Sequence, residues 1–154
     1  MRFQKWQFSL GAVSAVFHDV LIVLGIFSLT YKIMPFNMEI NQAFIAALLT
    51  VIGYSLNDTV VVFDRIREFF KIHSSWDSET TVNTALNSTL SRTLNTSLTT
   101  LIVLTAIFIF GGESIRGFMF ALIIGVMVGT YSSVFIATPI MFDSYKKRKS
   151  NLQT

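Results

Sequence analysis

Two aspartates lie inside long apolar stretches of this sequence, where an ionised group is costly. Asp19 falls in the stretch 8–29 and Asp58 in the stretch 40–63. A charge near the centre of a membrane helix costs about 2.5–3.5 kcal/mol on insertion scales, so such residues are usually paired and functional. Arg92 begins a later apolar stretch, and in an antiparallel bundle it would come near the depth of Asp58. We therefore expect an Asp58–Arg92 ion pair. A merely structural role for this pair is disfavoured, because neutral residues would join the helices at lower cost.

Polar residues cluster around these charges. Asn57 and Thr59 flank Asp58, and Ser55 lies three residues before it. A later stretch carries polar side chains at three- and four-residue spacing, namely Thr84, Ser88, Ser91, Asn95 and Thr99. Such a face would waste hydrogen bonds against lipid, so we expect it to line the bundle interior or a hydrated crevice. A second interpretation stays open, in which these hydroxyl and amide groups only join helices.

His18 and Asp19 are adjacent near the middle of the first apolar stretch. An imidazole titrates near neutrality, so the two could relay protons. They could equally form a buried hydrogen bond that joins helices. Adjacent helical residues point about 100° apart and share a face poorly, which favours the structural interpretation.

The composition indicates a membrane protein. The chain has 154 residues, of which 52% are hydrophobic and 14% charged, against about 25% charged in soluble domains. Four stretches reach the length of roughly 20 mostly apolar residues that a membrane helix requires: 8–29, 40–63, 93–112 and 117–142. The predicted fold class is an all-α membrane protein with four transmembrane helices in a single domain.

The same composition argues against other classes of site. The sequence has no cysteine and two isolated histidines, so we expect no disulfide, no metal site and no cofactor. The net charge of +3 arises from basic residues between apolar runs, which does not favour a nucleic-acid partner.

Basic residues also predict the orientation. If the four helices alternate, ten Lys and Arg residues fall on one side and only Lys32 and Arg116 on the other. The positive-inside rule then places both termini and the segment 64–92 in the cytoplasm. Within that segment, apolar residues at helical spacing predict an amphipathic helix lying in the interface. A simple solvated connector is the alternative. Asp77 or Ser78 could cap the helix that follows, and the basic tail 146–154 is expected to be frayed and attracted to anionic lipid.

The last apolar stretch carries small residues at every fourth position: Gly117, Ala121, Gly125, Gly129, Ser133 and Ala137. Small residues at this spacing let helix backbones approach closely. We interpret the stripe as a packing surface, and it says little about transport.

The run Gly53-Tyr54-Ser55-Leu56-Asn57-Asp58-Thr59-Val60-Val61-Val62-Phe63-Asp64-Arg65-Ile66-Arg67-Glu68 closely resembles a signature of the SecD/SecF protein-export family, on its SecF side. Three further stretches agree with this: Arg2-Phe3 through Trp6 leading into His18-Asp19-Val20, then residues 90–97, and finally Gly129-Thr130-Tyr131-Ser132-Ser133. The resemblance covers nearly the whole chain.

The resemblance implies a resistance-nodulation-division type membrane fold in the bacterial inner membrane. It implies SecD, the Sec translocon channel and, indirectly, the translocating preprotein as partners. Asp58 becomes the proton-coupling carboxylate and Arg92 its basic partner. The implied function couples proton movement to late-stage preprotein translocation and is not enzymatic.

Members on the SecF side normally have two more helices, with an extracytoplasmic domain between them, before the Arg-Phe motif with which this chain begins. We therefore expect the chain to be the last four of six helices, either as a fragment or as a short subunit that needs another chain. A non-energised structural subunit that stabilises the channel is the alternative function. An intramembrane aspartyl protease is disfavoured because Leu56-Asn57 lacks the glycine context of that class, and the signature disfavours a small-molecule exporter.

Overall fold

The computed structural model describes the backbone of residues 4–151 and the side chains of residues 6–147. It is a helical bundle with no strand among the described residues. In chain order the elements are α1 (Gln4–Thr30), α2 (Gln42–Ile72), α3 (Ser78–Phe110), α4 (Glu113–Ser132), the π-helical segment η1 (Ser133–Ala137) and α5 (Thr138–Asn151). Four segments are long and apolar enough to cross a membrane, so the predicted fold class is confirmed.

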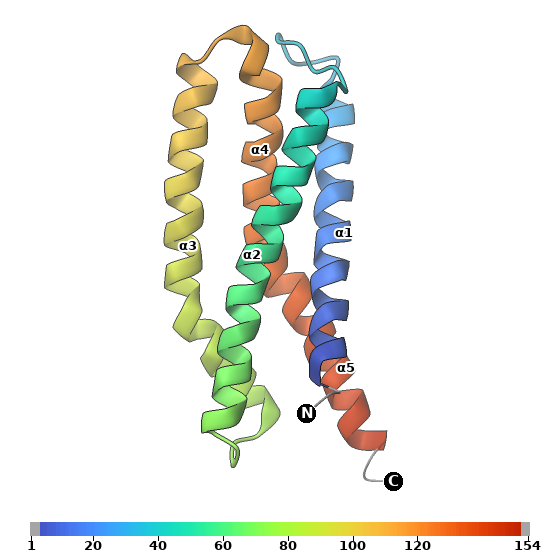
Figure 1. Ribbon diagram of the computed structural model, residues 1–154, viewed down its shortest axis with the longest axis vertical. Helices are drawn as coiled ribbons and strands as arrows, with labels where there is room; N and C mark the ends of the chain where they lie inside the picture. Colours follow the sequence, from blue (N-terminus) through green and yellow to red (C-terminus); the bar gives the residue numbers. More distant parts are fainter. Residues whose placement is uncertain (1–3, 152–154) are drawn as a thin grey trace.

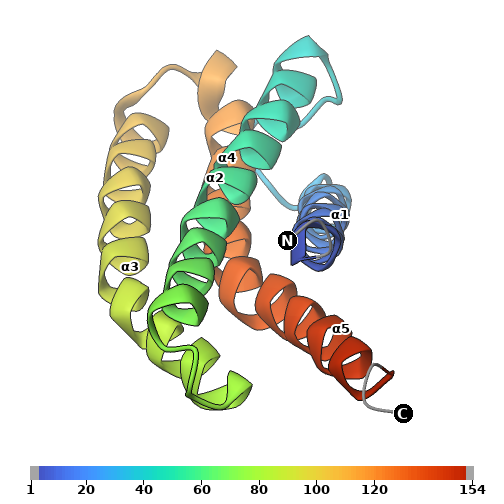
Figure 2. The ribbon, with the colours of Figure 1, turned by 60° about the horizontal axis from the view of Figure 1, so that its bottom comes forward.

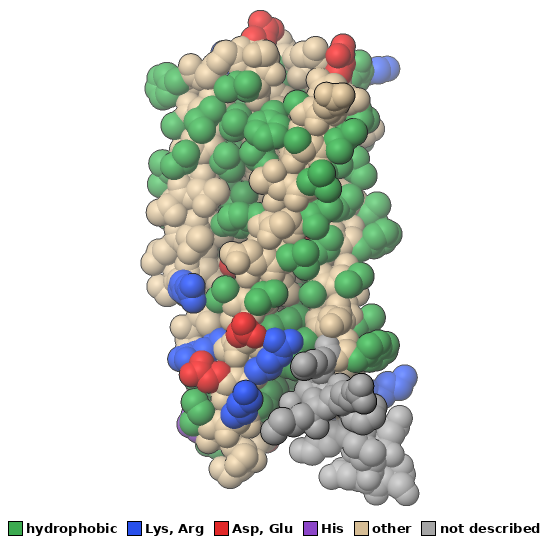
Figure 3. Space-filling model, viewed as in Figure 1, with side chains coloured by type: hydrophobic (Ala, Val, Ile, Leu, Met, Phe, Trp, Pro, Cys, Tyr) green, Lys and Arg blue, Asp and Glu red, His purple; other side chains and the backbone are tan. Residues whose placement is uncertain are grey.

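The helices alternate in direction, as short connections require. In Figure 1 the tight turn between α2 and α3 lies at the same end as the two chain ends, and the α1–α2 and α3–α4 connections lie at the opposite end. Figure 3 shows most charged side chains gathered at the end with the tight turn, and apolar side chains over the rest of the visible face. This arrangement matches the alternation on which the predicted orientation depends.

The segment 64–92 does not form the separate helix between the two membrane helices that the sequence predicted. Its first part is the continuation of α2 to Ile72 and its last part is the start of α3 at Ser78. At about 1.5 Å per residue, 31 and 33 residues give helices of about 46 and 50 Å, longer than the roughly 30 Å hydrocarbon core. The amphipathic pattern reflects packing on the bundle, since Ile66 is fully buried.

Asp77 is the N-cap of α3. Its carboxylate accepts hydrogen bonds from the backbone N–H groups of Glu79 and Thr80, each at 3.1 Å, which satisfies two amides that the first helical turn leaves free. The Thr80 hydroxyl and these amides lower the pKa of Asp77. The cap explains why α3 begins well before its apolar run.

The last apolar stretch is also interrupted, where a continuous helix over 117–142 was expected. After Ser132 the chain makes a π-helical segment and then continues as α5 to Asn151, in a clearly different direction from α4 (Figure 2). Pro139 explains the interruption, because it has no N–H and its ring crowds the carbonyl four residues earlier. The Thr138 hydroxyl donates to the Ser133 carbonyl at 3.0 Å. The tail predicted to be frayed from 146 is helical as far as the structure describes it.

The small-residue stripe lies against α2 and the α1–α2 connection. A β-carbon added at Gly117 would overlap the Asn37 carbonyl oxygen, and one at Gly125 would overlap the Val51 side chain. At Gly129 the nearest atom would be the Ser55 β-carbon at 3.2 Å. Ala121, between them, is fully buried. These positions let α4 approach α2 more closely than larger side chains would allow.

The buried interior has two apolar clusters. The first includes Val23, Phe27, Val51 and Ala121, and the second includes Ala15, Val62, Ile66, Ala137 and Met141. On α1, α2, α3 and the α4–η1 segment, the sequence between the two clusters holds buried polar residues. We call this set the polar layer; it comprises Asp19, Ser55, Asp58, Thr59, Thr89, Thr93, Ser97, Ser132 and Ser133.

Candidate functional site

Asp19 joins three helices within the polar layer. Its side chain is 1% exposed. One carboxylate oxygen accepts hydrogen bonds from Ser55 of α2 at 2.5 Å and Ser132 of α4 at 2.7 Å. The other oxygen lies 3.1 Å from Nδ1 of His18, whose side chain is one-third exposed. Asp19 therefore has three polar partners, which is the usual condition for burying such a group.

Asp58 lies on α2 one turn beyond Ser55, in the same layer. It is 8% exposed, and its one hydrogen bond among the described residues comes from the Ser133 hydroxyl at 3.2 Å. The Thr93 hydroxyl and the Arg92 charge on α3 also bear on this carboxylate, but Thr93 makes no hydrogen bond. Asp58 is thus a buried carboxylate that accepts a single hydrogen bond.

The expected Asp58–Arg92 ion pair is not formed. The ion pairs among the described residues are His18–Asp19, Arg65–Glu68 and Arg67–Asp64. Arg92 is exposed and borders a cavity of about 350 Å³ between α2 and α3, which Asp64, Arg65 and Glu68 also line. The two groups attract one another without contact. The pair is absent because the rotation of α3 places Arg92 on its exposed face and Thr93 on its buried face.

The same rotation places most of the predicted polar lining on the outer surface of this chain. Ser91 and Asn95, with Thr99, are exposed in this chain, and so is Asn57 on α2. The buried face of α3 instead carries Thr81, Ala85, Thr89, Thr93 and Ser97. Of the predicted lining residues, Ser55 and Thr59 are buried. Ser55 donates to Asp19, whereas the Thr59 hydroxyl has no hydrogen-bond partner among the described residues.

Sequence reasoning gave too little weight to two serines. Ser132 and Ser133 are each fully buried and donate to Asp19 and Asp58 respectively. Both belong to the Gly129–Ser133 motif, and Ser133 had been assigned to the packing stripe alone. A pair of adjacent hydroxyls in an apolar helix was the available signal, because a membrane interior leaves such groups few partners other than the helix's own carbonyls.

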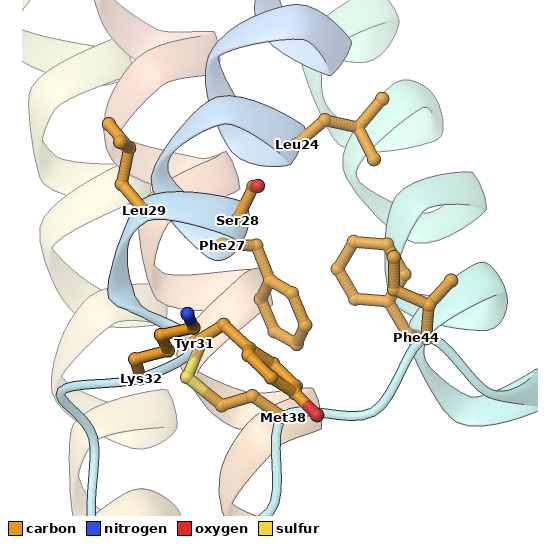
Figure 4. A pocket seen from close by; sticks show the side chains of 9 residues that line it. Leu24, Phe27, Ser28, Leu29, Tyr31, Lys32, Met38 and Phe44 are labelled. Atoms are coloured by element: carbon orange, nitrogen blue, oxygen red, sulfur yellow. The ribbon is translucent and has the colours of Figure 1, made fainter.

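A larger cavity of about 520 Å³ lies where α1 ends and α2 begins, away from this layer. Figure 4 shows the Phe27 and Phe44 rings facing one another within it, with Lys32 and Tyr31 nearby. Its lining is mostly apolar and holds no carboxylate. Nor do the described residues include a cluster of three or more potential metal ligands. The candidate site is therefore the polar layer, and its reactive groups are two carboxylates and their hydroxyl partners.

Comparison with known families identifies the family of membrane proteins in which this polar layer occurs. The family model "Protein export membrane protein SecD/SecF, C-terminal" matches residues 1–147. The chain belongs to the SecD/SecF family. Among its SecF relatives, each named "Protein translocase subunit SecF", the Rhodothermus marinus protein is 59% identical over 139 residues, covering 90% of this chain and 45% of the relative. The Haemophilus influenzae protein is 45% identical over 145 residues, covering 94% and 43%.

Solved structures agree with this SecD/SecF assignment. The crystal structure of SecDF in a super-membrane-facing form superposes with a TM-score of 0.87 at 41% identity, covering 96% of this chain and 19% of that one. SecDF from Thermus thermophilus, described as a translocon-associated membrane protein, gives a TM-score of 0.80 at 42% identity, covering 92% and 19%. The chain spans less than half the length of the SecF relatives it matches, and it is a multi-pass membrane protein of the SecF kind.

Proposed function

We propose that this chain is the membrane part of a SecF subunit that acts with SecD to couple proton movement across the bacterial inner membrane to late-stage preprotein translocation. Asp58 is the group that gains and loses the proton. Arg92 supplies the positive charge that favours its ionised form. The preprotein and the translocon channel are contacted by other parts of the assembly, and no covalent chemistry is involved.

The observation that carries the proposal is the contrast between two buried carboxylates. Asp19 has three polar partners, as a permanent structural group requires. Asp58 is nearly as buried but has one hydrogen bond, at 3.2 Å. A buried carboxylate with little support can lose its charge at modest cost, because neutralisation removes the desolvation penalty that burial imposes. Asp58 is therefore the better suited of the two to bind a proton reversibly.

The exposed polar surface at the depth of Asp58 supports a partner in the membrane. Asn57, Ser91, Arg92, Asn95 and Thr99 are exposed on α2 and α3. Polar and charged groups at this depth are costly against hydrocarbon. Transmembrane helices of SecD would cover them, and the polar lining expected from the sequence would then lie between the two subunits. The crystallised relatives are SecDF proteins, which agrees with this partner.

The coupling step follows from the charges. Protonation neutralises Asp58, removes its attraction to Arg92 and changes how α2 packs against α3 and α4. With both termini and the α2–α3 turn in the cytoplasm, the proton would arrive from the outer side. One charge crossing 100 mV is worth about 2.3 kcal/mol, which is enough to bias two packing arrangements. Repeated cycles would be needed to draw out a long polypeptide.

The decisive experiment replaces Asp58 in the complete SecF protein, reconstituted with SecD and the translocon in vesicles. Asp58→Asn keeps the size and polarity of the side chain but cannot titrate. We expect gradient-dependent translocation to be lost while association with SecD, followed by co-purification, remains. Full stimulation by Asp58→Asn would instead favour a non-energised structural subunit. Lost association would show that Asp58 serves assembly, which also contradicts the proposed function.

A further inference from the structure

Adjacent hydroxyls at the junction of α4 and η1 hold different carboxylates. Ser132 Oγ donates to Asp19 on α1 at 2.7 Å, and Ser133 Oγ donates to Asp58 on α2 at 3.2 Å. Both serines are fully buried. Since consecutive helical residues point about 100° apart, this junction is fastened to two neighbouring helices at once.

The two fastenings differ in strength. Asp19 is also held by Ser55 and His18, so its link to Ser132 belongs to a network. Asp58 has no second hydrogen bond within the described part of the chain, and its hydrogen bond to Ser133 is 0.5 Å longer than the one between Asp19 and Ser132 (3.2 against 2.7 Å). A change at Asp58 can therefore release Ser133 while Ser132 stays in place.

Ser133 also has a second acceptor within reach. Its hydroxyl lies 2.9 Å from the Thr130 carbonyl and 3.2 Å from the Asp58 carboxylate, but a hydroxyl has a single hydrogen to donate. An ionised Asp58 can only accept, so it competes for that hydrogen. A protonated Asp58 can donate to Ser133 Oγ instead, which frees the Ser133 hydrogen for the Thr130 carbonyl. Protonation thus reverses the direction of this hydrogen bond.

The reversal takes place at the start of an irregular turn. η1 is π-helical, so its backbone hydrogen bonds span five residues instead of the four of an α-helix. This geometry occurs mostly as single turns within α-helices and is frequent at functional sites. Beyond it, Pro139 cannot donate a backbone hydrogen bond, and the Ser133 carbonyl is held by the Thr138 side chain. The backbone between Ser132 and α5 therefore has fewer regular restraints than the helices on either side.

We propose that Ser133 transmits the protonation state of Asp58 to η1, and that α5 moves relative to α2 about the fixed contact between Ser132 and Asp19. This inference rests on the proposed function of Asp58. Ser133 is a positioning residue, because it acts on Asp58 and on the backbone without carrying the proton across the membrane.

Other ionisable groups near this junction are few. Asp58 faces Arg92 from α3, and Asp19 faces His18 from its own helix. Tyr54 of α2 donates to Ser97 at 3.3 Å, and Ser97 lies 2.6 Å from the Thr130 hydroxyl. The charged side chains described on α4, Glu113 and Arg116, lie in its first turn, and those on α5, Asp143, Lys146 and Lys147, follow η1 by at least six residues. Of these groups, Asp58 alone has its hydrogen bond to the first residue of η1.

The test measures movement directly in the complete SecF protein with SecD in nanodiscs. Spin labels on Ile72, at the end of α2, and on Lys146 of α5 report the distance between the two helices, and both positions are exposed. Asp58→Asn mimics the protonated state because its amide can donate to Ser133 Oγ. We expect Asp58→Asn to shift the distance distribution when Ser133 is present and to cause no shift in Ser133→Ala.

Matched variants separate the hydroxyl from the side-chain volume. The side chains introduced by Ser133→Thr and Ser133→Val have the same shape, but only the threonine hydroxyl can reverse its hydrogen bond with Asp58. The Asp58→Asn distance shift should therefore persist in Ser133→Thr and vanish in Ser133→Val. Gradient-dependent translocation should fall about tenfold in Ser133→Ala, the factor that about 1.4 kcal/mol represents.

Two outcomes would overturn the inference. One is an Asp58→Asn shift that survives in Ser133→Ala and Ser133→Val. The other is the absence of any shift when Ser133 is present. Translocation that is lost in Asp58→Asn but normal in Ser133→Ala contradicts this inference alone. Translocation that is insensitive to Asp58→Asn contradicts the proposed function itself.

Discussion

Ser55 on α2 donates a hydrogen bond of 2.5 Å to Asp19 on α1, close to the point where Gly129 of α4 faces the Ser55 β-carbon. Ser132 of α4 reaches the same carboxylate oxygen. Three helices therefore meet at a single buried acid. This contact favours a structural role for Asp19, as the sequence interpretation of His18 and Asp19 did, and it gives the bundle a fixed point beside the less supported Asp58.

Asp19→Ala should lower the free energy of unfolding of the complete protein by about 2 kcal/mol. The estimate assumes three lost interactions at about 0.6 kcal/mol each, the average for hydrogen bonds between membrane helices. Unfolding in mixed micelles with increasing SDS, followed by circular dichroism, measures the change. His18→Ala removes one partially exposed partner and should cost less than Asp19→Ala. An equal cost for the two variants would contradict the assignment of Asp19 as the shared contact.

Gly125→Leu should loosen α4 from α2, because even a β-carbon at this position would overlap Val51. Overpacking of this kind typically costs about 1–3 kcal/mol. Gly25→Leu is the matched control, since a β-carbon there meets no atom within 4 Å. The yield of SecD-associated protein after mild detergent extraction should fall for Gly125→Leu and stay near wild type for Gly25→Leu. Equal yields would mean that α4 does not pack on α2 in the membrane.

Arg92→Met should abolish gradient-dependent translocation with little effect on the folding of this subunit. Removing one partner of a buried ion pair typically costs about 3–5 kcal/mol, but Arg92 is exposed and makes no ion pair with Asp58, so a change below about 0.5 kcal/mol is expected. Arg92→Lys should retain part of the activity, because a point charge replaces a planar guanidinium. A large loss of stability in Arg92→Met would show that the pair does form in the membrane.

Reporter fusions test the orientation that the basic residues predict. Fusions at Asn37 and Glu113 should report the extracytoplasmic side, and fusions at Trp76 and Asn151 the cytoplasm. The reason is the ten-to-two distribution of Lys and Arg between the two ends of the alternating helices. Alkaline phosphatase and green fluorescent protein, active on opposite sides of the membrane, provide the paired readout. A cytoplasmic signal at Asn37 would reverse the direction from which protons reach Asp58.

The sequence alone determined the fold class, the alternation of the helices and the family. These features depend on length, hydropathy and extended motifs, which are one-dimensional properties of a membrane chain. It also singled out Asp19 and Asp58, because a charge in an apolar run is visible without any coordinates. The start of α3 could also be predicted, because Asp77 was one of the two N-cap residues that the sequence suggested.

The tertiary structure decided which side chains meet. Helix periodicity fixes the spacing of a polar face but leaves the rotation of the helix open. Ser91 and Asn95 were predicted to line the bundle interior or a crevice, whereas Thr93 and Ser97 are the residues buried within this chain. The rotation of α3 also kept Arg92 out of contact with Asp58, whose hydrogen-bond partner is Ser133 instead. The turn at Ser133 depends on Pro139 and on how α4 and α5 pack around α1. Contacts between residues 75 or 113 positions apart arise from the packing of whole helices, and no local pattern in the sequence encodes them.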